Sequence, residues 1–200
     1  MDGKDISIDF TPDTTEYPLA LDPTLSFTAP GMSNTGDVMT GEATSNYFGY
    51  AMTSGDFNSD GKPDLAVGAH GYSTNTGRVY IFYNDGGIPT TAATADVTIT
   101  GNATSDRFGN SLIAGDLNTD GRTDLIVGAY GYSSDTGRVY IFYNDGSIPI
   151  TAATADVTIT GEAGSWFSWD LGLAVGDLNV DGRTDLVVGA NSYSSNTGRA

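Results

Sequence analysis

Three acidic segments of nine residues recur at intervals of 60 and 61 residues: DFNSDGKPD at 56–64, DLNTDGRTD at 116–124 and DLNVDGRTD at 177–185. Positions 1, 3, 5 and 9 of each segment carry carboxylate or amide oxygens, and the glycine at position 6 permits a sharp turn. Calcium takes about six to eight oxygen ligands, which a curled loop supplies from alternate side chains and from the main-chain carbonyl at position 7. The candidate ligands are Asp56, Asn58, Asp60, Lys62, Asp64, Asp116, Asn118, Asp120, Arg122, Asp124, Asp177, Asn179, Asp181, Arg183 and Asp185.

Other interpretations of these segments fit less well. An EF-hand needs an acidic residue at position 12, and here that position holds Val67, Val127 or Val188. Magnesium prefers to keep its waters and needs a stricter octahedron. Asp-Asn-Gly clusters also make good hairpin turns. A turn alone does not require three carboxylates, however, since each pair about 5 Å apart repels by about 3 kcal/mol at an effective dielectric of about 20. We therefore expect hairpin turns whose curl is held by about three calcium ions, one in each loop.

The composition restricts the class of partner. A net charge of −17 argues against nucleic acid or an anionic membrane, because both require a basic face. Cysteine is absent from the 200 residues, which excludes disulfides and thiolate metal sites. The start of the chain, MDGKDISIDF, lacks the basic and apolar regions of a signal peptide, and no stretch is long enough to span a bilayer. We expect no membrane insertion, and a signal for secretion would have been removed or would lie upstream.

An internal repeat dominates the chain. Residues 71–100 and 131–160 differ at four of thirty positions, and the period of about 60 residues suits a four-stranded propeller blade with long loops. Alternating apolar residues predict strands near 50–56, 64–69, 78–83 and 97–100 in the first copy. In the third of these strands, Val79 and Ile81 face one side while Tyr80 and Phe82 face the other, as in a strand covered on both sides. No segment shows a helical period with caps.

The repeat divides the chain into four parts. Residues 1–36 are predicted to be a linker or an irregular edge segment, and 37–100 hold the end of a preceding blade and a first full blade. Residues 101–160 form a second full blade, and 161–200 form a third that is truncated, because its third and fourth strands are not in the sequence. The fold class expected is all-β, with about three blades of four antiparallel strands in an incomplete ring.

These motifs together resemble the FG-GAP repeat family, which builds the propeller of integrin alpha subunits. The resemblance covers about residues 37–200 and rests on the acidic loops, on TGRVYIFY, on VGAH, VGAY and VGAN, and on Phe48-Gly49 and Phe108-Gly109. In the third copy we expect Trp169-Asp170 at the Phe-Gly position. The resemblance implies a seven-bladed ring with calcium loops between the first two strands of each blade, opposite the usual ligand surface. A fragment of such a ring is favoured over a ring closed by a second subunit.

Residues outside the loops do not form a catalytic set. The single histidine, His70, is expected in a surface loop, and no general base is left for serine or cysteine catalysis. Arg78, Arg138 and Arg199 recur in TGR and are expected to pair with carboxylates. Trp166 and Trp169 occur in the third copy only, where burial between blades is favoured over a carbohydrate or protein contact.

The function expected from the sequence is a non-catalytic, calcium-binding adhesion or recognition module outside the cell or on its surface. Its partners would be the remaining blades of a longer chain or a second subunit, with a protein or carbohydrate ligand. The alternative is an accessory propeller of a larger secreted hydrolase whose active site lies outside this chain.

Overall fold

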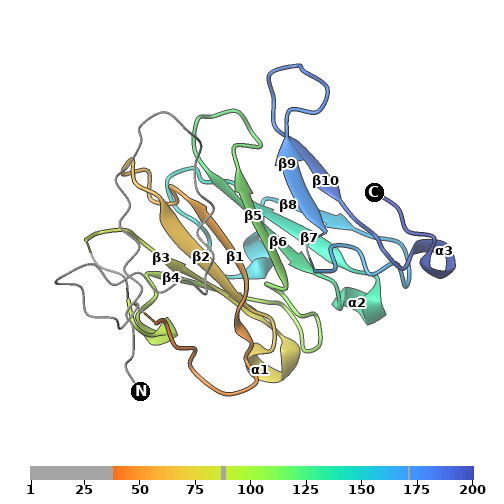
Figure 1. Ribbon diagram of the computed structural model, residues 1–200, viewed down its shortest axis with the longest axis horizontal. Helices are drawn as coiled ribbons and strands as arrows, with labels where there is room; N and C mark the ends of the chain where they lie inside the picture. The colour runs from red at the N-terminus through yellow and green to blue at the C-terminus, as the bar shows by residue number, and fades with distance from the viewer. Residues whose placement is uncertain (1–37, 87–88, 171) are drawn as a thin grey trace, which may run out of the picture. The chain divides into compact units, whose positions relative to one another are not determined.

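The computed structural model describes residues 38–86, 89–170 and 172–200, and in these residues the fold is built from antiparallel strands (Figure 1). Two four-stranded sheets and one two-stranded sheet follow each other along the chain. The first sheet contains β1 (Phe48–Gly55), β2 (Asp64–Ala69), β3 (Arg78–Phe82) and β4 (Val97–Thr100). The second contains β5 (Ser111–Gly115), β6 (Asp124–Ala129), β7 (Arg138–Phe142) and β8 (Val157–Thr160), and the third contains β9 (Leu173–Gly176) and β10 (Asp185–Val188).

The strands confirm the expected all-β class and the four-stranded antiparallel blades. Each complete sheet keeps its strands in sequence order, as the hairpin connections require. Three of the strands predicted in the first repeat match the structure within one residue, whereas β1 begins two residues earlier than expected. The prediction for residues 1–36 lies outside the described residues.

Short turns replace helices, in agreement with the absence of a helical period in the sequence. The segments α1 (Tyr72–Asn75), α2 (Tyr132–Asp135) and α3 (Tyr193–Asn196) each contain residues with left-handed backbone angles, such as Ser73 at φ 48°. The single 3₁₀ turns η1 (Ala92–Thr94) and η2 (Ala152–Thr154) precede the fourth strands. These elements are compact connections between strands.

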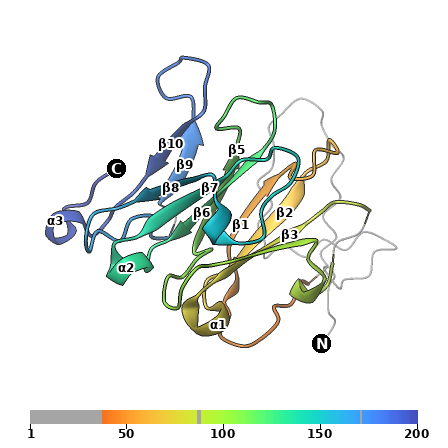
Figure 2. The ribbon, with the colours of Figure 1, turned by 180° about the vertical axis from the view of Figure 1, so that it is seen from behind.

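The hydrophobic core lies between successive sheets, as the alternation on the third strand predicted. Val79 and Ile81 of β3 pack with Phe108 and Tyr140 of the second repeat, whereas the alternate side chains of β3 belong to a separate cluster. A further cluster joins the second sheet to the third. The inner strands β1, β5 and β9 lie side by side where the sheets meet (Figure 1 and Figure 2). The second sheet therefore packs against a neighbouring sheet through each of its faces.

The Phe-Gly position of the third repeat is occupied by Phe167-Ser168, so the prediction of Trp169-Asp170 is wrong. A Cβ built on Gly77 would lie 2.0 Å from the carbonyl oxygen of Phe108, and one built on Gly137 would lie 2.3 Å from that of Phe167. Relative to the second repeat, the third has one residue fewer before this phenylalanine and two more between it and Leu173, the residue equivalent to Leu112 in the first strand. Counting back from the acidic loop therefore selects the wrong aromatic residue.

The arginine that recurs in TGR stacks on a tyrosine in each of the three repeats. The guanidinium carbon lies 3.7 Å from the Tyr72 ring centroid for Arg78, 3.7 Å from Tyr132 for Arg138 and 5.1 Å from Tyr193 for Arg199. Ion pairs join Arg78 to Glu42 at 3.6 Å and Arg199 to Glu162 at 2.7 Å, which confirms the pairing expected for these two arginines. The residue equivalent to these glutamates in the second repeat is Asn102, which cannot form an ion pair. A cation–π contact is therefore the feature that all three arginines share.

We predict that Gly77→Ala destabilises the fold more than Gly49→Ala. Both glycines have left-handed φ angles, +85° and +88°, so both substitutions carry the same backbone strain of about 1 kcal/mol. A Cβ at Gly77 would also collide with the Phe108 backbone, whereas nothing lies within 4 Å of one at Gly49. Urea unfolding of both variants measures the difference, and equal losses of unfolding free energy would contradict the close approach between sheets.

Candidate metal centre

The three acidic loops occupy equivalent places in the fold. Each loop joins the first two strands of its sheet: β1 to β2, β5 to β6 and β9 to β10. All three project at one end of the sheets, and the turns α1, α2 and α3 lie at the other end (Figure 1). The structure thus places the candidate ligands of each segment together within one loop and keeps the three loops separate.

Side-chain oxygens at positions 1, 3 and 5 turn into the loop and accept hydrogen bonds from its own backbone. In the first loop, Asp56 accepts from the N–H groups of Asp60 at 3.0 Å and Gly61 at 2.9 Å. Asn58 accepts from Asp60 at 3.0 Å, and Asp60 accepts from Lys62 at 2.9 Å. The second and third loops repeat these bonds. The same curl is therefore produced three times.

Left-handed backbone angles at positions 4 and 6 produce the curl. Position 6 is glycine in each loop, and its φ is +85° in Gly61, +85° in Gly121 and +83° in Gly182. Position 4 is not glycine, although its φ is also positive, reaching 62° at Val180. A β-branched residue rarely adopts this conformation, because its side chain crowds the backbone. Val180 is therefore the most strained residue of the third loop.

The aspartate at position 9 joins its loop to the rest of the sheet. Asp64 is buried, and its Oδ2 accepts from the N–H groups of Phe57 at 2.8 Å and Asn58 at 3.2 Å. Its Oδ1 accepts from the N–H of Asn84, just after β3, at 2.8 Å. Asp124 makes the equivalent bonds, and burial raises the pKa of its carboxyl group although the backbone donors oppose that shift. The carboxylate therefore holds the loop against the third strand.

The side chain at position 7 reaches from the loop to the residues that follow the third strand. The Nζ of Lys62 lies 3.6 Å from the Asp60 carboxylate and donates to the carbonyl of Asn84 at 3.3 Å. Arg122 likewise donates to the carbonyl of Asn144 at 3.4 Å. Since these side chains are cationic, this position could contribute only its main-chain carbonyl to a metal.

The donor set is suited to calcium, although the described residues do not form a ready metal cluster. In residues 38–86, 89–170 and 172–200, no group of three or more acidic or histidine side chains is arranged to hold an ion. Each loop nevertheless offers carboxylate and amide oxygens with no nitrogen or sulfur ligand, which is the chemistry calcium prefers. A carboxylate oxygen that accepts one backbone hydrogen bond keeps a free lone pair. The assignment of these residues as metal ligands stays a prediction.

Asn144 connects the first loop to the second sheet, and the sequence patterns did not single it out. Its buried side-chain amide donates to the carbonyl oxygens of Asp56 at 3.4 Å and Phe57 at 3.1 Å. Phe57, the apolar residue at position 2, is buried in the core between these sheets. The equivalent Leu117 packs against the cluster between the second and third sheets, whereas Leu178 is 67% exposed. Position 2 therefore anchors a loop to the next sheet where one is present.

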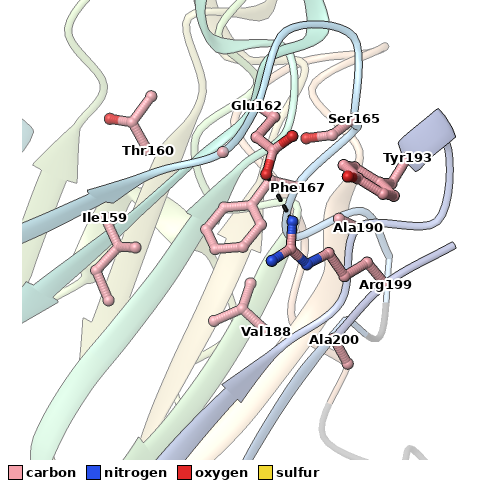
Figure 3. Close-up of a pocket in the computed structure, with 11 residues that line it drawn as sticks. Ile159, Thr160, Glu162, Ser165, Phe167, Val188, Ala190, Tyr193, Arg199 and Ala200 are labelled. Carbon is pink, nitrogen blue, oxygen red and sulfur yellow. Dashed lines mark hydrogen bonds and ion pairs between the residues drawn. The ribbon is translucent and has the colours of Figure 1, made fainter.

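An apolar pocket lies beside the third sheet (Figure 3), lined among others by Phe167, Val188 and Arg199. In the second repeat, the equivalent Phe108 contacts Tyr140 and Phe142 of β7, with ring centroids 5.3 and 6.2 Å apart. In the second repeat, aromatic side chains of the third strand fill the place beside this phenylalanine. In the third repeat, the pocket occupies the equivalent place.

His70 lies in the turn directly after β2, as expected, where it is half-buried and stacks on Tyr47 with ring centroids 4.9 Å apart. The tryptophans depart from their predicted environment. Trp166 and Trp169 stack on each other at 4.6 Å and are partly exposed, and neither belongs to a core cluster between sheets. The prediction of burial between blades is wrong, because the phenylalanine that enters the core is Phe167.

The part of the chain that the structure describes has no helix long and apolar enough to cross a membrane.

We predict that Val180→Asn stabilises the third loop by about 1 kcal/mol, because asparagine tolerates the left-handed conformation that valine resists. Val180 is 87% exposed, so its replacement removes no core contact. Ile150→Asn is the control, since Ile150 is also exposed but has a negative φ. Thermal unfolding in EDTA compares the two variants, and a decrease or no change for Val180→Asn would contradict the assignment of strain.

Comparisons with known proteins agree with this geometry. The model of the FG-GAP repeat matches residues 48–82, 108–142 and 171–200, which amount to half of the chain. Phosphatidylinositol-glycan-specific phospholipase D of Bos taurus is 37% identical over 155 residues, covering 71% of this chain and 18% of that protein. Integrin alpha-IIb of Mus musculus is 37% identical over 166 residues, covering 77% and 16%. Integrin alpha-PS5 of Drosophila melanogaster is 36% identical over 150 residues, covering 72% and 14%.

The chain thus spans less than a fifth of the length of these curated relatives. Two of the matched ranges begin at the Phe-Gly pairs Phe48-Gly49 and Phe108-Gly109, and all three contain an acidic loop. The matched ranges therefore include the motifs on which the resemblance was based. The chain belongs to the FG-GAP repeat family.

Proposed function

We propose that this chain is a calcium-stabilised segment of an FG-GAP propeller and acts as a non-catalytic scaffold for adhesion or recognition outside the cell. The observation that carries the proposal is the threefold repetition of one oxygen-rich loop at the same end of the sheets. Hairpin turns need no such repetition of carboxylates.

Calcium would be held by the residues at positions 1, 3, 5, 7 and 9 of each loop. Asp60, Asp120 and Asp181 occupy the centre of these sets, and each already shares a loop with two further aspartates. A bound ion would supply the positive charge that offsets the repulsion among the carboxylates. Because Asp64 and Asn144 tie the first loop to β3 and to the second sheet, holding the loop would also stiffen the contact between sheets.

A non-catalytic role is supported by the position of the titratable groups. The only histidine of the sequence stacks on tyrosine, and cysteine is absent. The carboxylates of the loops are engaged by backbone N–H groups, which suits a structural role more than proton transfer.

The apolar pocket beside the third sheet supports the remaining blades as partners. An extended segment with aromatic residues that face Phe167 would fill the pocket as Tyr140 and Phe142 do in the second sheet. The occupant we propose is a strand of the same family, supplied by a longer chain or by a second subunit. Completion of a seven-bladed ring is part of the same proposal.

A second candidate function is an accessory propeller of a larger secreted hydrolase. The similarity to phosphatidylinositol-glycan-specific phospholipase D over 18% of that protein favours this candidate. The coding sequence on either side of the chain separates the candidates. A neighbouring catalytic domain would support the accessory role, and further repeats with a surface anchor would support the adhesion role.

We predict that millimolar calcium raises the unfolding temperature of the full chain and that EDTA lowers it. An ion that binds only the folded state at about 100 times its Kd adds about 2.7 kcal/mol per site, which corresponds to roughly 5 to 10 °C. The combined substitutions Asp60→Ala, Asp120→Ala and Asp181→Ala should abolish the calcium effect. Differential scanning calorimetry measures the transition, and calorimetric titration counts the ions bound.

The control variant carries Asp85→Ala and Asp145→Ala, which remove exposed carboxylates outside the acidic loops. It should keep the full response to calcium, because we attribute that response to the aspartates of the loops and not to the total negative charge of the chain. Identical transitions of the parent chain with calcium and with EDTA would refute the metal assignment.

A further inference from the structure

Three positions at the end of the sheets opposite the acidic loops differ in chemical type among the repeats. Hydrogen bonds establish their equivalence: the N–H of the second position donates to the carbonyl of the first in each repeat. These positions vary in type, whereas the nearby segments 71–100 and 131–160 are nearly identical and differ at four of thirty positions. The first position holds Tyr47, Arg107 and Trp166; the second holds Tyr50, Asn110 and Trp169; the third holds His70, Tyr130 and Asn191.

Side chains of the first repeat form one half of an aromatic patch. His70 stacks on Tyr47 at 4.9 Å with an interplanar angle of 2°, and it meets Tyr50 edge-on at 4.4 Å. The two tyrosines are 58% and 51% exposed, and the buried Nδ1 of His70 has no hydrogen-bond partner. Exposed aromatic surface beside an unsatisfied polar atom is typical of a ligand site.

Side chains of the second and third repeats form the other half. Tyr130 meets Trp169 edge-on at 4.2 Å, and Trp169 stacks on Trp166 at 4.6 Å. The guanidinium of Arg107 lies over Tyr130, 4.8 Å from its ring centroid, and donates a hydrogen bond to its hydroxyl group. Residues from two sheets therefore converge on one aromatic group.

Asp170 joins the halves into one surface. The hydroxyl group of Tyr50 donates a hydrogen bond to Asp170, although the two residues are 120 positions apart in the sequence. This bond, with burial, raises the pKa of Tyr50 to about 12. Burial and the nearby Arg107 lower the pKa of His70, and Asp170 opposes that shift. Since Tyr50 contacts both His70 and Asp170, and Asp170 directly follows Trp169, the two halves belong to one patch.

We propose that this aromatic patch binds a neutral saccharide, with sugar rings packed on the exposed aromatic faces and hydroxyl groups bonded to the polar side chains between them. Aromatic rings with polar groups at their edges provide both kinds of contact. Saccharide binding here is the recognition activity of the scaffold proposed above, and it depends on that proposal.

The charge of the patch favours a neutral ligand over a charged one. The guanidinium of Arg107 and the carboxylate of Asp170 balance each other, and burial with the nearby Arg107 lowers the pKa of His70, which disfavours its charged form. Arg107 would repel a cationic ligand. An anionic ligand would be repelled by Asp170 and by the overall charge of −17. A ligand rich in hydroxyl groups can accept from Arg107 and donate to Asp170 at the same time.

Tryptophan fluorescence tests the proposal directly, because both tryptophans of the chain lie in the patch. The full chain is titrated with neutral hexasaccharides of glucose, mannose and N-acetylglucosamine, in calcium and in EDTA, with heparin and polylysine as charged probes. At least one neutral hexasaccharide should change the emission saturably. The variants Tyr47→Ala and Asp170→Asn should raise its Kd by about tenfold or more, and both keep the two tryptophans.

Met52→Ala is the matched control, since Met52 is 61% exposed on β1 and lies outside the patch, and its Kd should not change. Circular dichroism verifies that every variant is folded. The proposal would be overturned if the folded parent chain showed no fluorescence response to any neutral hexasaccharide at millimolar concentration. A response to heparin or polylysine alone would also overturn it. The unfolding temperature of the same samples reports the calcium effect separately, so failure of the metal proposal is distinguishable from failure of saccharide binding.

Discussion

Face-to-face packing of successive sheets is the interaction on which the rest of the structure depends. Val79 and Ile81 on one face of β3, and Tyr80 and Phe82 on the other, are all buried, so neither face is available to solvent. The second sheet covers the face with Val79 and Ile81, and the other face packs on Phe48 and on residues such as Met39 and Ala92 that lie outside the strands. The close approach of Gly77 to Phe108 shows how tightly the repeats are joined, because even a methyl group cannot be placed between them.

The same packing explains why the acidic loops are structural parts of the fold. Phe57 extends from the first loop into the core between sheets, and Asn144 of the second repeat binds the carbonyl groups of Asp56 and Phe57. A loop that is anchored at both places presents its carboxylates in a nearly fixed arrangement. Calcium would then stabilise the junction between repeats, because its ligands share one nine-residue loop with Phe57 and with the carbonyl groups that Asn144 binds.

The two ends of the sheets differ in which features are repeated. The acidic end repeats one loop with little variation, as expected where the backbone conformation itself is required. The opposite end repeats the backbone but changes the side chains, so that Tyr47, Arg107 and Trp166 occupy one position. A repeated scaffold can diverge there without loss of its core, because these side chains are not members of the hydrophobic clusters between the sheets.

The sequence by itself determined the strands, the turn positions, the acidic loops and the family, because these follow from local rules. Alternation of period two assigns the two faces of a strand, and glycine with aspartate and asparagine defines the loop between strands. The internal repeat made each local pattern visible more than once, so the strand positions 64–69 and 97–100 agreed with the structure.

Only the tertiary structure decided which residues meet across repeats. It assigned Phe167 to the core in place of Trp169, because insertions around this position shift the spacing on which sequence counting relies. It also joined Tyr50 to Asp170 across 120 residues. No local pattern encodes such a contact, since it exists only after three sheets have stacked and brought their equivalent ends together.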